Sequence, residues 1–314
     1  MGNSSVASCM YTLNANQQKA MNNLVIGVDI GGTHITACMV NTDTGQIIEG
    51  ACVRAEIDPL QNKEHIISSW AETITACAKQ HGSTIDHIGI AMPGPFDYEK
   101  GISLITGLHK YECLYGLNVK ELLGESLGIP SGNIRMMNDA TAYLAGELKV
   151  GAGQGCNYVA GITLGTGLGS AMYEDGFFHE GDLWCFPFRE SRAEEFLSSR
   201  WFISEYAKRK KEKVTGVKEL ASLAIDDVVA RKLFEEFGYT LGEVLKNRFS
   251  DHFPECIIIG GNIAKAWHLF KPYCEEVIRQ RTDVCKLVSA QLGENAALMG
   301  AAYLWEQKNL SGDF

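Results

Sequence analysis

The 314-residue sequence predicts an α/β protein built from two related halves that face each other. Two observations lead to this fold class. An apolar strand, a glycine-rich turn and a second apolar strand occur at Val25–Val40 and recur at Tyr158–Tyr173. Short apolar strands then alternate with helical patterns through the rest of each half. A glycine-rich break at Gly151–Gly155 is the best candidate for the seam between the halves.

In the first half, a third strand at Gln46–Ala55 follows the hairpin after a second turn, which gives an antiparallel meander. A helix is expected over Glu64–His81, because apolar residues recur there at helical spacing: Ile66, Ile67, Trp70, Ile74 and Cys77. The remaining elements expected in this half are the strand His87–Met92, the helix Lys120–Leu127, the strand Ile134–Met137 and the helix Ala140–Lys149.

The second half repeats the opening hairpin, because residues 161–167 (GITLGTG) align without a gap with residues 27–33 (GVDIGGT). A further strand that ends in glycines lies at Ile257–Gly261. The other elements expected here are helices over Ala193–Lys211, Lys218–Lys246, Ile263–Arg281 and Glu294–Glu306, and a strand over Val284–Ala290. We expect a break in the third of these helices near Pro272.

The charge pattern argues against a nucleic-acid partner. The formal net charge is −10, whereas binding to nucleic acid needs clusters of Lys and Arg. The basic run at 207–213 (AKRKKEK) is therefore expected to be the solvated end of a helix. No apolar run is long enough to span a membrane, and the residues through Asn22 lack the basic and apolar regions of a signal peptide, so they are expected to form a loose tail or a short edge strand.

The ten cysteines occur singly, and no two are spaced as C-x-x-C. Several lie within apolar runs. We therefore expect buried, reduced thiols in a cytoplasmic protein.

The glycine-rich turns indicate a phosphate site. A P-loop needs a Lys after its second Gly, and a Rossmann fingerprint opens a helix; neither pattern occurs here. Two hairpin turns remain, and bare backbone N–H groups at such tips bind anions. The predicted phosphate-binding residues are Gly31, Gly32 and Thr33 in the first turn and Gly165, Thr166 and Gly167 in the second. Asp29, beside the first turn, is placed to manage a metal ion.

Six motifs in order then resemble the ROK family of sugar kinases, within the actin, hexokinase and Hsp70 ATPase superfamily. The motifs are residues 28–33 (VDIGGT), 89–95 (GIAMPGP), 137–140 (MNDA), 164–169 (LGTGLG), 258–262 (IIGGN) and 295–301 (NAALMGA). The resemblance implies two ribonuclease-H-like (actin-like ATPase) domains with a cleft between them. It places a tail at 1–23, an N-terminal domain at 24–141 completed by 296–314, and a larger C-terminal domain at 142–295. A homodimer is also implied.

The resemblance further implies an ATP- and Mg²⁺-dependent kinase that phosphorylates a hydroxyl of a hexose or N-acylhexosamine. Asp139 is implied as the base that takes the proton from the sugar hydroxyl, with Asn138, Pro93 and Gly94 against the sugar. A capping role for Asp139 at the helix that follows is compatible with this. Asp29 is implied to bind Mg²⁺ through water. The residues implied to lie against adenosine are Gly260, Gly261 and Asn262.

The sugar side departs from the family pattern. The family's Glu-x-Gly-His motif has no counterpart in Phe178–Phe188, where His179, Glu180 and Asp182 are the candidate replacements. The family's zinc knot is absent, because Cys185 is the only thiol from 157 to 255, so no zinc site is expected.

Two alternatives follow from these departures. One is a sugar or nucleotide sensor of the ROK family without catalytic activity. The other, which is less favoured, is a sugar-responsive transcriptional regulator without its DNA-binding region, because only about two dozen residues precede the first strand.

Overall fold

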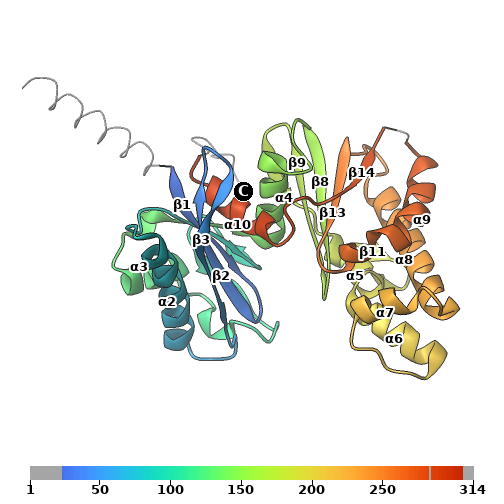
Figure 1. Cartoon of the computed structure of the whole chain (residues 1–314), viewed down its shortest axis with the longest axis horizontal. Helices are drawn as coiled ribbons and strands as arrows, with labels where there is room; N and C mark the ends of the chain where they lie inside the picture. The colour runs from blue at the N-terminus through green and yellow to red at the C-terminus, as the bar shows by residue number, and fades with distance from the viewer. Residues whose placement is uncertain (1–22, 283, 307–314) are drawn as a thin grey trace, which may run out of the picture. The chain divides into compact units, whose positions relative to one another are not determined.

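The computed structural model describes residues 23–282 and 284–306, and these form two compact units. The first contains residues 23–142 and 297–306, and the second contains residues 143–296. Each unit is built on a five-stranded mixed sheet with helices on it (Figure 1). The predicted fold class, α/β with a repeated half, is therefore confirmed. The prediction for the segment through Asn22 lies outside the described residues.

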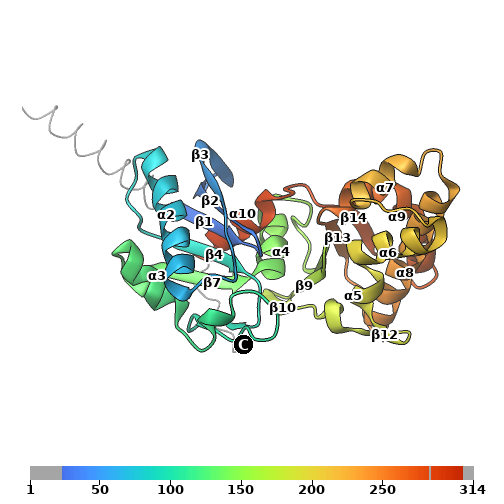
Figure 2. The same ribbon diagram turned by 90° about the horizontal axis from the view of Figure 1, so that it is seen from below.

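The first unit holds a sheet of order β3-β2-β1-β4-β7, in which β1, β2 and β3 are antiparallel neighbours and β4 and β7 run parallel to β1. The helices α2 and α3 pack together on one face of it (Figure 2). The main elements are β1 Leu24–Ile30, β2 His34–Asn41, β3 Gln46–Glu56, α2 Lys63–His81, β4 Ile88–Met92, α3 Val119–Leu127, β7 Ile134–Asn138 and α10 Asn295–Tyr303. The short elements are β5 Phe96–Asp97, β6 Ile102–Ser103, η1 Glu112–Leu114 and η2 Ser131–Asn133.

The second unit has a sheet of order β10-β9-β8-β13-β14 with the same directions. Its main elements are α4 Asp139–Val150, which begins in the first unit, β8 Tyr158–Leu164, β9 Leu168–Glu174, β10 Phe177–Glu180, α6 Ser199–Lys210, α7 Val217–Leu223, α8 Val228–Arg248, β13 Cys256–Gly260, α9 Trp267–Arg279 and β14 Lys286–Ser289. The short elements are η3 Leu183–Cys185, β11 Pro187–Phe188, β12 Ser191–Arg192, α5 Ala193–Phe196 and η4 Ile263–Ala266.

The two sheets repeat one another closely at their central strands. β1 and β8 are both seven residues long and share one burial pattern along their length. Gly27 and Gly161 occupy equivalent positions, and each lies under a helix. A Cβ on Gly27 would lie 2.3 Å from the carbonyl oxygen of Leu298 in α10, and one on Gly161 would lie 3.1 Å from Leu144 in α4. The repeat therefore includes the helix that covers each central strand.

The expected break at Pro272 does not occur, because α9 continues through it. Proline removes one backbone hydrogen bond, but α9 is held along its length against α8. Gly238 and Gly242 of α8 permit this close packing, since a Cβ on Gly238 would lie 2.4 Å from the Phe270 carbonyl oxygen. Tertiary packing here outweighs a local helix-breaking signal.

The prediction of reduced, buried cysteines is wrong for four of the described residues. Cys38 and Cys52 form a disulfide, with their Cα atoms 4.1 Å apart. The cause is strand register, since β2 and β3 pair these two residues directly across the ladder. Cys113 and Cys185 are free thiols but are exposed. Within the described ranges, no helix is both long and apolar enough to cross a membrane.

Candidate active site

Three predicted site segments of the first unit lie along one edge of its sheet. The parallel strands β1, β4 and β7 end there, with Asp29 paired to Ala91 and Met92 paired to Asn138. Asp29, the Pro93–Gly94 segment and Asn138 therefore follow one another across adjacent strand ends. This is the edge at which open α/β sheets bind their ligands.

The first turn is tied down through the backbone of Gly31. Its N–H donates to the His34 carbonyl at 2.9 Å, so this N–H is not bare as predicted, because it closes the hairpin. Its carbonyl oxygen accepts a hydrogen bond of 2.6 Å from the hydroxyl of Tyr111. The Thr33 hydroxyl contacts His34 Nδ1 at 2.8 Å. Gly32 has open space where a Cβ would stand, so the tip of the turn is accessible to a ligand.

Tyr111 was not anticipated as a site residue. It is fully buried, and its ring packs edge-to-face on Trp70 with centroids 5.4 Å apart. Burial raises the pKa of Tyr111, so its hydroxyl remains a protonated donor. The contact with Gly31 joins residues 80 positions apart in the chain, and no local pattern in the sequence indicates it.

Asn138 and Asp139 have different roles at the start of α4. The Asn138 side-chain oxygen accepts from the N–H groups of Ala140 and Thr141, at 2.9 and 3.3 Å, so Asn138 caps the helix. Its amide nitrogen donates to the Tyr98 hydroxyl at 3.3 Å. Tyr98 in turn donates to the Met92 carbonyl at 2.9 Å. This chain of bonds links the end of β7 to the end of β4.

The Asp139 carboxyl is left with one uncommitted oxygen. Oδ1 accepts from the Ala140 N–H at 2.9 Å, whereas Oδ2 has no hydrogen bond to another described residue. Burial raises the pKa of the Asp139 carboxyl above its ordinary value. The Ala140 hydrogen bond and the positive charge of Lys110 act in the opposite direction. A half-buried carboxylate with a raised pKa and a free oxygen suits a proton acceptor.

The second turn belongs to the second unit and is held differently. The Gly165 N–H donates to the Gly167 carbonyl at 3.0 Å, and the Gly165 carbonyl accepts from the Ser199 N–H at 2.8 Å. Ser199 is the first residue of α6, so the helix N-terminus lies against the turn. The hydroxyl of the preceding Ser198 is buried without a partner among the described residues. Gly165 has open space on its Cβ side, and Thr166 is exposed.

The Glu194 carboxylate holds the end of the second turn through a hydrogen bond. Its Oε2 accepts from the Leu168 N–H at 3.1 Å, and its other oxygen pairs with Arg200 at 3.1 Å. Like Tyr111, this carboxylate was missed in the sequence, because the contact spans 26 residues.

The candidate replacements on the sugar side are exposed in the second unit. His179 and Glu180 end β10, and Asp182 follows Gly181 with a positive φ of 51°. The Gly181 N–H donates to the Ser170 carbonyl at 3.0 Å, and a Cβ on Gly181 would lie 2.4 Å from the Ser170 hydroxyl. The segment is thus fixed by its backbone while its polar side chains face outward.

The glycines predicted to lie against adenosine have a structural reason of their own. A Cβ on Gly260 would lie 2.0 Å from the Tyr143 hydroxyl, and one on Gly261 would lie 2.4 Å from the Leu164 carbonyl oxygen. Atoms of the protein, the Tyr143 hydroxyl and the Leu164 carbonyl oxygen, therefore exclude a side chain at these two positions, whether or not adenosine is bound. Asn262, which follows, is exposed.

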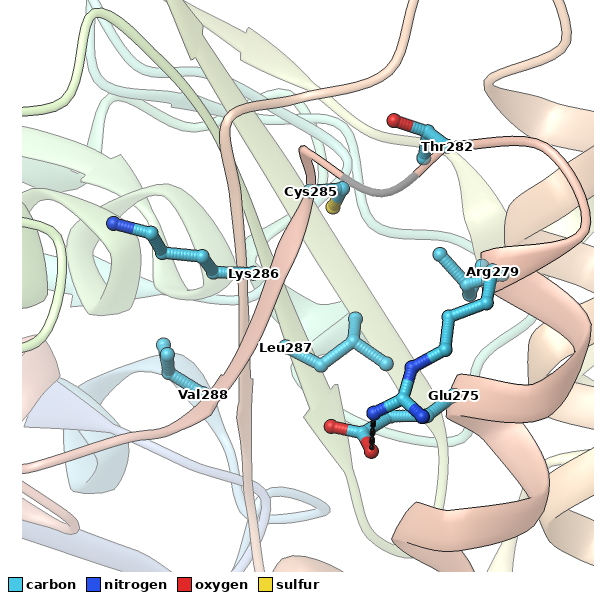
Figure 3. Close-up of a pocket in the computed structure, with 8 residues that line it drawn as sticks. Glu275, Arg279, Thr282, Cys285, Lys286, Leu287 and Val288 are labelled. Atoms are coloured by element: carbon cyan, nitrogen blue, oxygen red, sulfur yellow. Dashed lines mark hydrogen bonds and ion pairs between the residues drawn. The ribbon is translucent and has the colours of Figure 1, made fainter.

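A pocket of about 370 Å³ lies between the end of α9 and the edge strand β14 (Figure 3). Arg279 lines it but is paired with Glu275 at 3.0 Å. The lining includes none of the predicted site residues. Among the described residues, no three His, Cys, Asp or Glu side chains are grouped to hold a metal ion.

Comparison with known proteins settles the family. The model of the ROK family matches residues 25–183 and 191–308. The chain belongs to the ROK family. It is 26% identical to a glucokinase of Thermotoga maritima over 90% of this chain and 98% of that protein. It is 22% identical to an N-acetyl-D-glucosamine kinase of Photobacterium profundum over 88% of this chain and 98% of the relative.

A solved ROK structure has the same fold. The crystal structure of a ROK glucokinase from Streptomyces griseus, in complex with glucose and AMPPNP, superposes with a TM-score of 0.71 at 24% identity. The match covers 90% of this chain and 98% of the other. The fold of this chain is thus that of the ROK kinases.

Proposed function

We propose that this chain is an ATP-dependent kinase that phosphorylates a hydroxyl group of a hexose or an N-acylhexosamine. The observation that carries the proposal is the state of Asp139. Asn138 takes over the capping of α4, so Asp139 keeps a free carboxylate oxygen at the sheet edge that also carries Asp29. Burial raises the pKa of this half-buried carboxyl above its ordinary value, which favours its action as a general base.

The first turn and Asp29 fit a nucleotide with its metal ion. The open Cβ side of Gly32 leaves room for phosphate oxygens, and Asp29 supplies a half-buried carboxylate three residues earlier. Magnesium keeps several waters and needs few protein carboxylates, so Asp29 would hold it through water. The ion, when bound, neutralises charge on the transferring phosphoryl group. The homodimer and the cytoplasmic location, which were expected from the sequence, stay predictions.

The sugar is expected at the ends of β4 and β7. Tyr98 fixes the Asn138 amide there and also limits the space at Gly94, whose Cβ would lie 3.0 Å from the Tyr98 hydroxyl. Since the Asn138 oxygen is used as a cap and one amide N–H donates to Tyr98, the second N–H is the part of Asn138 left to face a sugar.

A screen of ADP release with hexoses and N-acylhexosamines tests the proposal. The wild type should respond to at least one sugar, and Asp139→Asn should lower kcat by about 10³-fold, since loss of a general base costs between about 10² and 10⁴. Asp226→Asn, an exposed change in the second unit, serves as the matched control. If Asp139→Asn keeps the wild-type activity, the assignment of Asp139 as the base is wrong.

A sensor without catalytic activity is the second candidate, and the exposure of His179, Glu180 and Asp182 favours it. Binding of a sugar, measured by calorimetry, without ADP release from any sugar in the screen would support the sensor and count against the kinase.

A further inference from the structure

The loop that carries Tyr111 also carries a lysine with no assigned role. Lys110 precedes Tyr111, and the structure shows no ion pair within 4.0 Å between Lys110 and another described residue. Lys100, by contrast, pairs with Asp97 at 3.0 Å. An unpaired, half-buried lysine beside a candidate catalytic edge calls for an explanation.

The backbone on both sides of Lys110 adopts a conformation that non-glycine residues rarely take. His109 and Tyr111 both have a φ of +54°. Such conformations are strained and persist where the surrounding structure imposes them. Here the loop is imposed by Tyr111, whose N–H donates to the Pro59 carbonyl at 2.8 Å and whose hydroxyl donates to Gly31.

Two observations connect Lys110 with the first turn and with the base. Its neighbour Tyr111 donates a hydrogen bond of 2.6 Å to the Gly31 carbonyl oxygen, so the loop that carries Lys110 is held at the turn proposed to bind phosphate. In addition, burial raises the pKa of the Asp139 carboxyl, and the positive charge of Lys110 acts in the opposite direction. If Asp139 is the base, a cation that reaches both this turn and the base can act on the phosphoryl group that moves between them.

We propose that Lys110 is a catalytic residue that donates a hydrogen bond to a non-bridging oxygen of the transferring phosphoryl group, with Tyr111 as its positioning residue. The proposal rests on the proposed kinase function. In the step, Asp139 takes the proton from the sugar hydroxyl, and the sugar oxygen forms a bond to the γ-phosphorus. The bond from the γ-phosphorus to the bridging oxygen breaks, and ADP leaves with the electron pair. Lys110 keeps its proton throughout and stabilises charge on the phosphoryl oxygens.

Lys110→Met tests the contact, with Lys79→Met, an exposed lysine of α2, as the matched control. Lys110→Met is expected to lower kcat by about 10²-fold, while the KM for the sugar changes by less than about threefold. Lys110→Arg should retain more activity because it keeps the charge. A wild-type kcat in Lys110→Met would overturn the proposal. A loss confined to the KM would overturn it too, since Lys110 would then bind the acceptor only.

The pH profile separates a contact role from a merely structural one. Removing the charge of Lys110 should raise the pKa of Asp139, so the acidic limb of kcat/KM should move to higher pH in Lys110→Met and stay in place in Lys110→Arg. Tyr111→Phe keeps the charge of Lys110 but removes the hydrogen bond to Gly31 that holds the loop of Lys110 in position. It should lower kcat by about tenfold without moving the limb. An unmoved limb in Lys110→Met would show that Lys110 does not face the base.

Calorimetry with ADP, Mg²⁺ and aluminium fluoride reads the same contact without any sugar. Lys110→Met should bind the ADP–aluminium fluoride complex about tenfold more weakly than wild type, with unchanged affinity for ADP alone. If no sugar is phosphorylated but this difference is found, the kinase function fails and the phosphoryl contact stands. Equal affinities would overturn the Lys110 proposal even if the wild type is an active kinase.

Discussion

The β1–β2 turn and the β8–β9 turn begin at equivalent glycines and differ in the group that holds each glycine's carbonyl oxygen. The carbonyl of Gly31 accepts from a buried tyrosine hydroxyl, whereas that of Gly165 accepts from the N-terminal N–H of α6. In both turns the glycine's own N–H closes the hairpin. A repeated sheet therefore preserves the turn but not the element that supports it.

The neighbouring strands differ in the same way. Asp29 pairs with Ala91, and the equivalent Thr163 pairs with Gly260. The strand beside the second turn thus ends in Gly260, with Gly261 directly after it, whereas the strand beside the first turn ends in the larger residues Ala91 and Met92. The first sheet instead carries a disulfide between β2 and β3, while Met172, the counterpart of Cys38, pairs with His179. The two turns are therefore held by different contacts, and a substitution can remove the contacts of one turn without changing those of the other.

The largest effect is expected from Gly261→Ala, which should disrupt the second turn alone. The new Cβ would lie 2.4 Å from the Leu164 carbonyl oxygen, and the residue has a φ of +83°. We expect a loss of about 3 kcal/mol or more in the free energy of unfolding, measured by chemical denaturation. Gly165→Ala is the control, because open space surrounds that position; its stability should change by less than about 0.5 kcal/mol. Equal losses in both variants would contradict the role given to Gly261.

Breaking the Cys38–Cys52 disulfide should weaken the first unit only. The bond closes a loop with a sequence separation of 14, for which the chain-entropy model gives about 3 kcal/mol. Cys52→Ser should therefore lower the Tm, and addition of a reductant should lower the wild-type Tm to the same extent. Cys113→Ser, at an exposed free thiol, should leave the Tm unchanged. Mass spectrometry of alkylated protein that finds both thiols free would refute the pairing.

Tyr111→Phe removes one hydroxyl and should cost about 1–3 kcal/mol, since the Gly31 carbonyl loses its buried donor. Hydrogen exchange should show faster opening of the β1–β2 turn and unchanged exchange at the β8–β9 turn. Tyr115→Phe, at an exposed tyrosine of the same loop, is the control. Loosening of both turns to the same degree would mean that they do not have separate supports.

The smallest expected effect is a gain in thermal stability in the variant Asp139→Asn. Burial raises the pKa of Asp139 in the folded chain, so the native state binds that proton more tightly than the unfolded state does. The stability from the protonated form is present in acid and is lost as pH rises through the folded pKa. Asp139→Asn mimics the protonated form and should have a Tm a few degrees above wild type at neutral pH, with the difference shrinking toward acid. Calorimetric scans across pH measure this, and a lower Tm at neutral pH would contradict it.

The sequence by itself determined the repeat, the strand and helix order and the positions of both glycine turns. These are local signals: alternating or continuous apolar runs, helical spacing and glycine at tight turns. The strand of residues 134–137 followed by Asn138–Asp139 was enough to place Asp139 at a sheet edge. The sequence suggested Asp139 as the cap of α4, whereas in the structure Asn138 accepts from the N–H groups of both Ala140 and Thr141.

Only the tertiary structure decided how the turns are supported. The contact of Tyr111 with Gly31 spans 80 residues, and the Cys38–Cys52 bond depends on a register between strands. The reason for the glycines at 260 and 261 likewise lies in Tyr143 and Leu164, far away in the chain. Local patterns record the conformation a residue prefers, whereas these contacts arise when distant segments pack at close range. The effect of the Lys110 charge on the pKa of Asp139 belongs to this second class, because the two residues come from different segments of the chain.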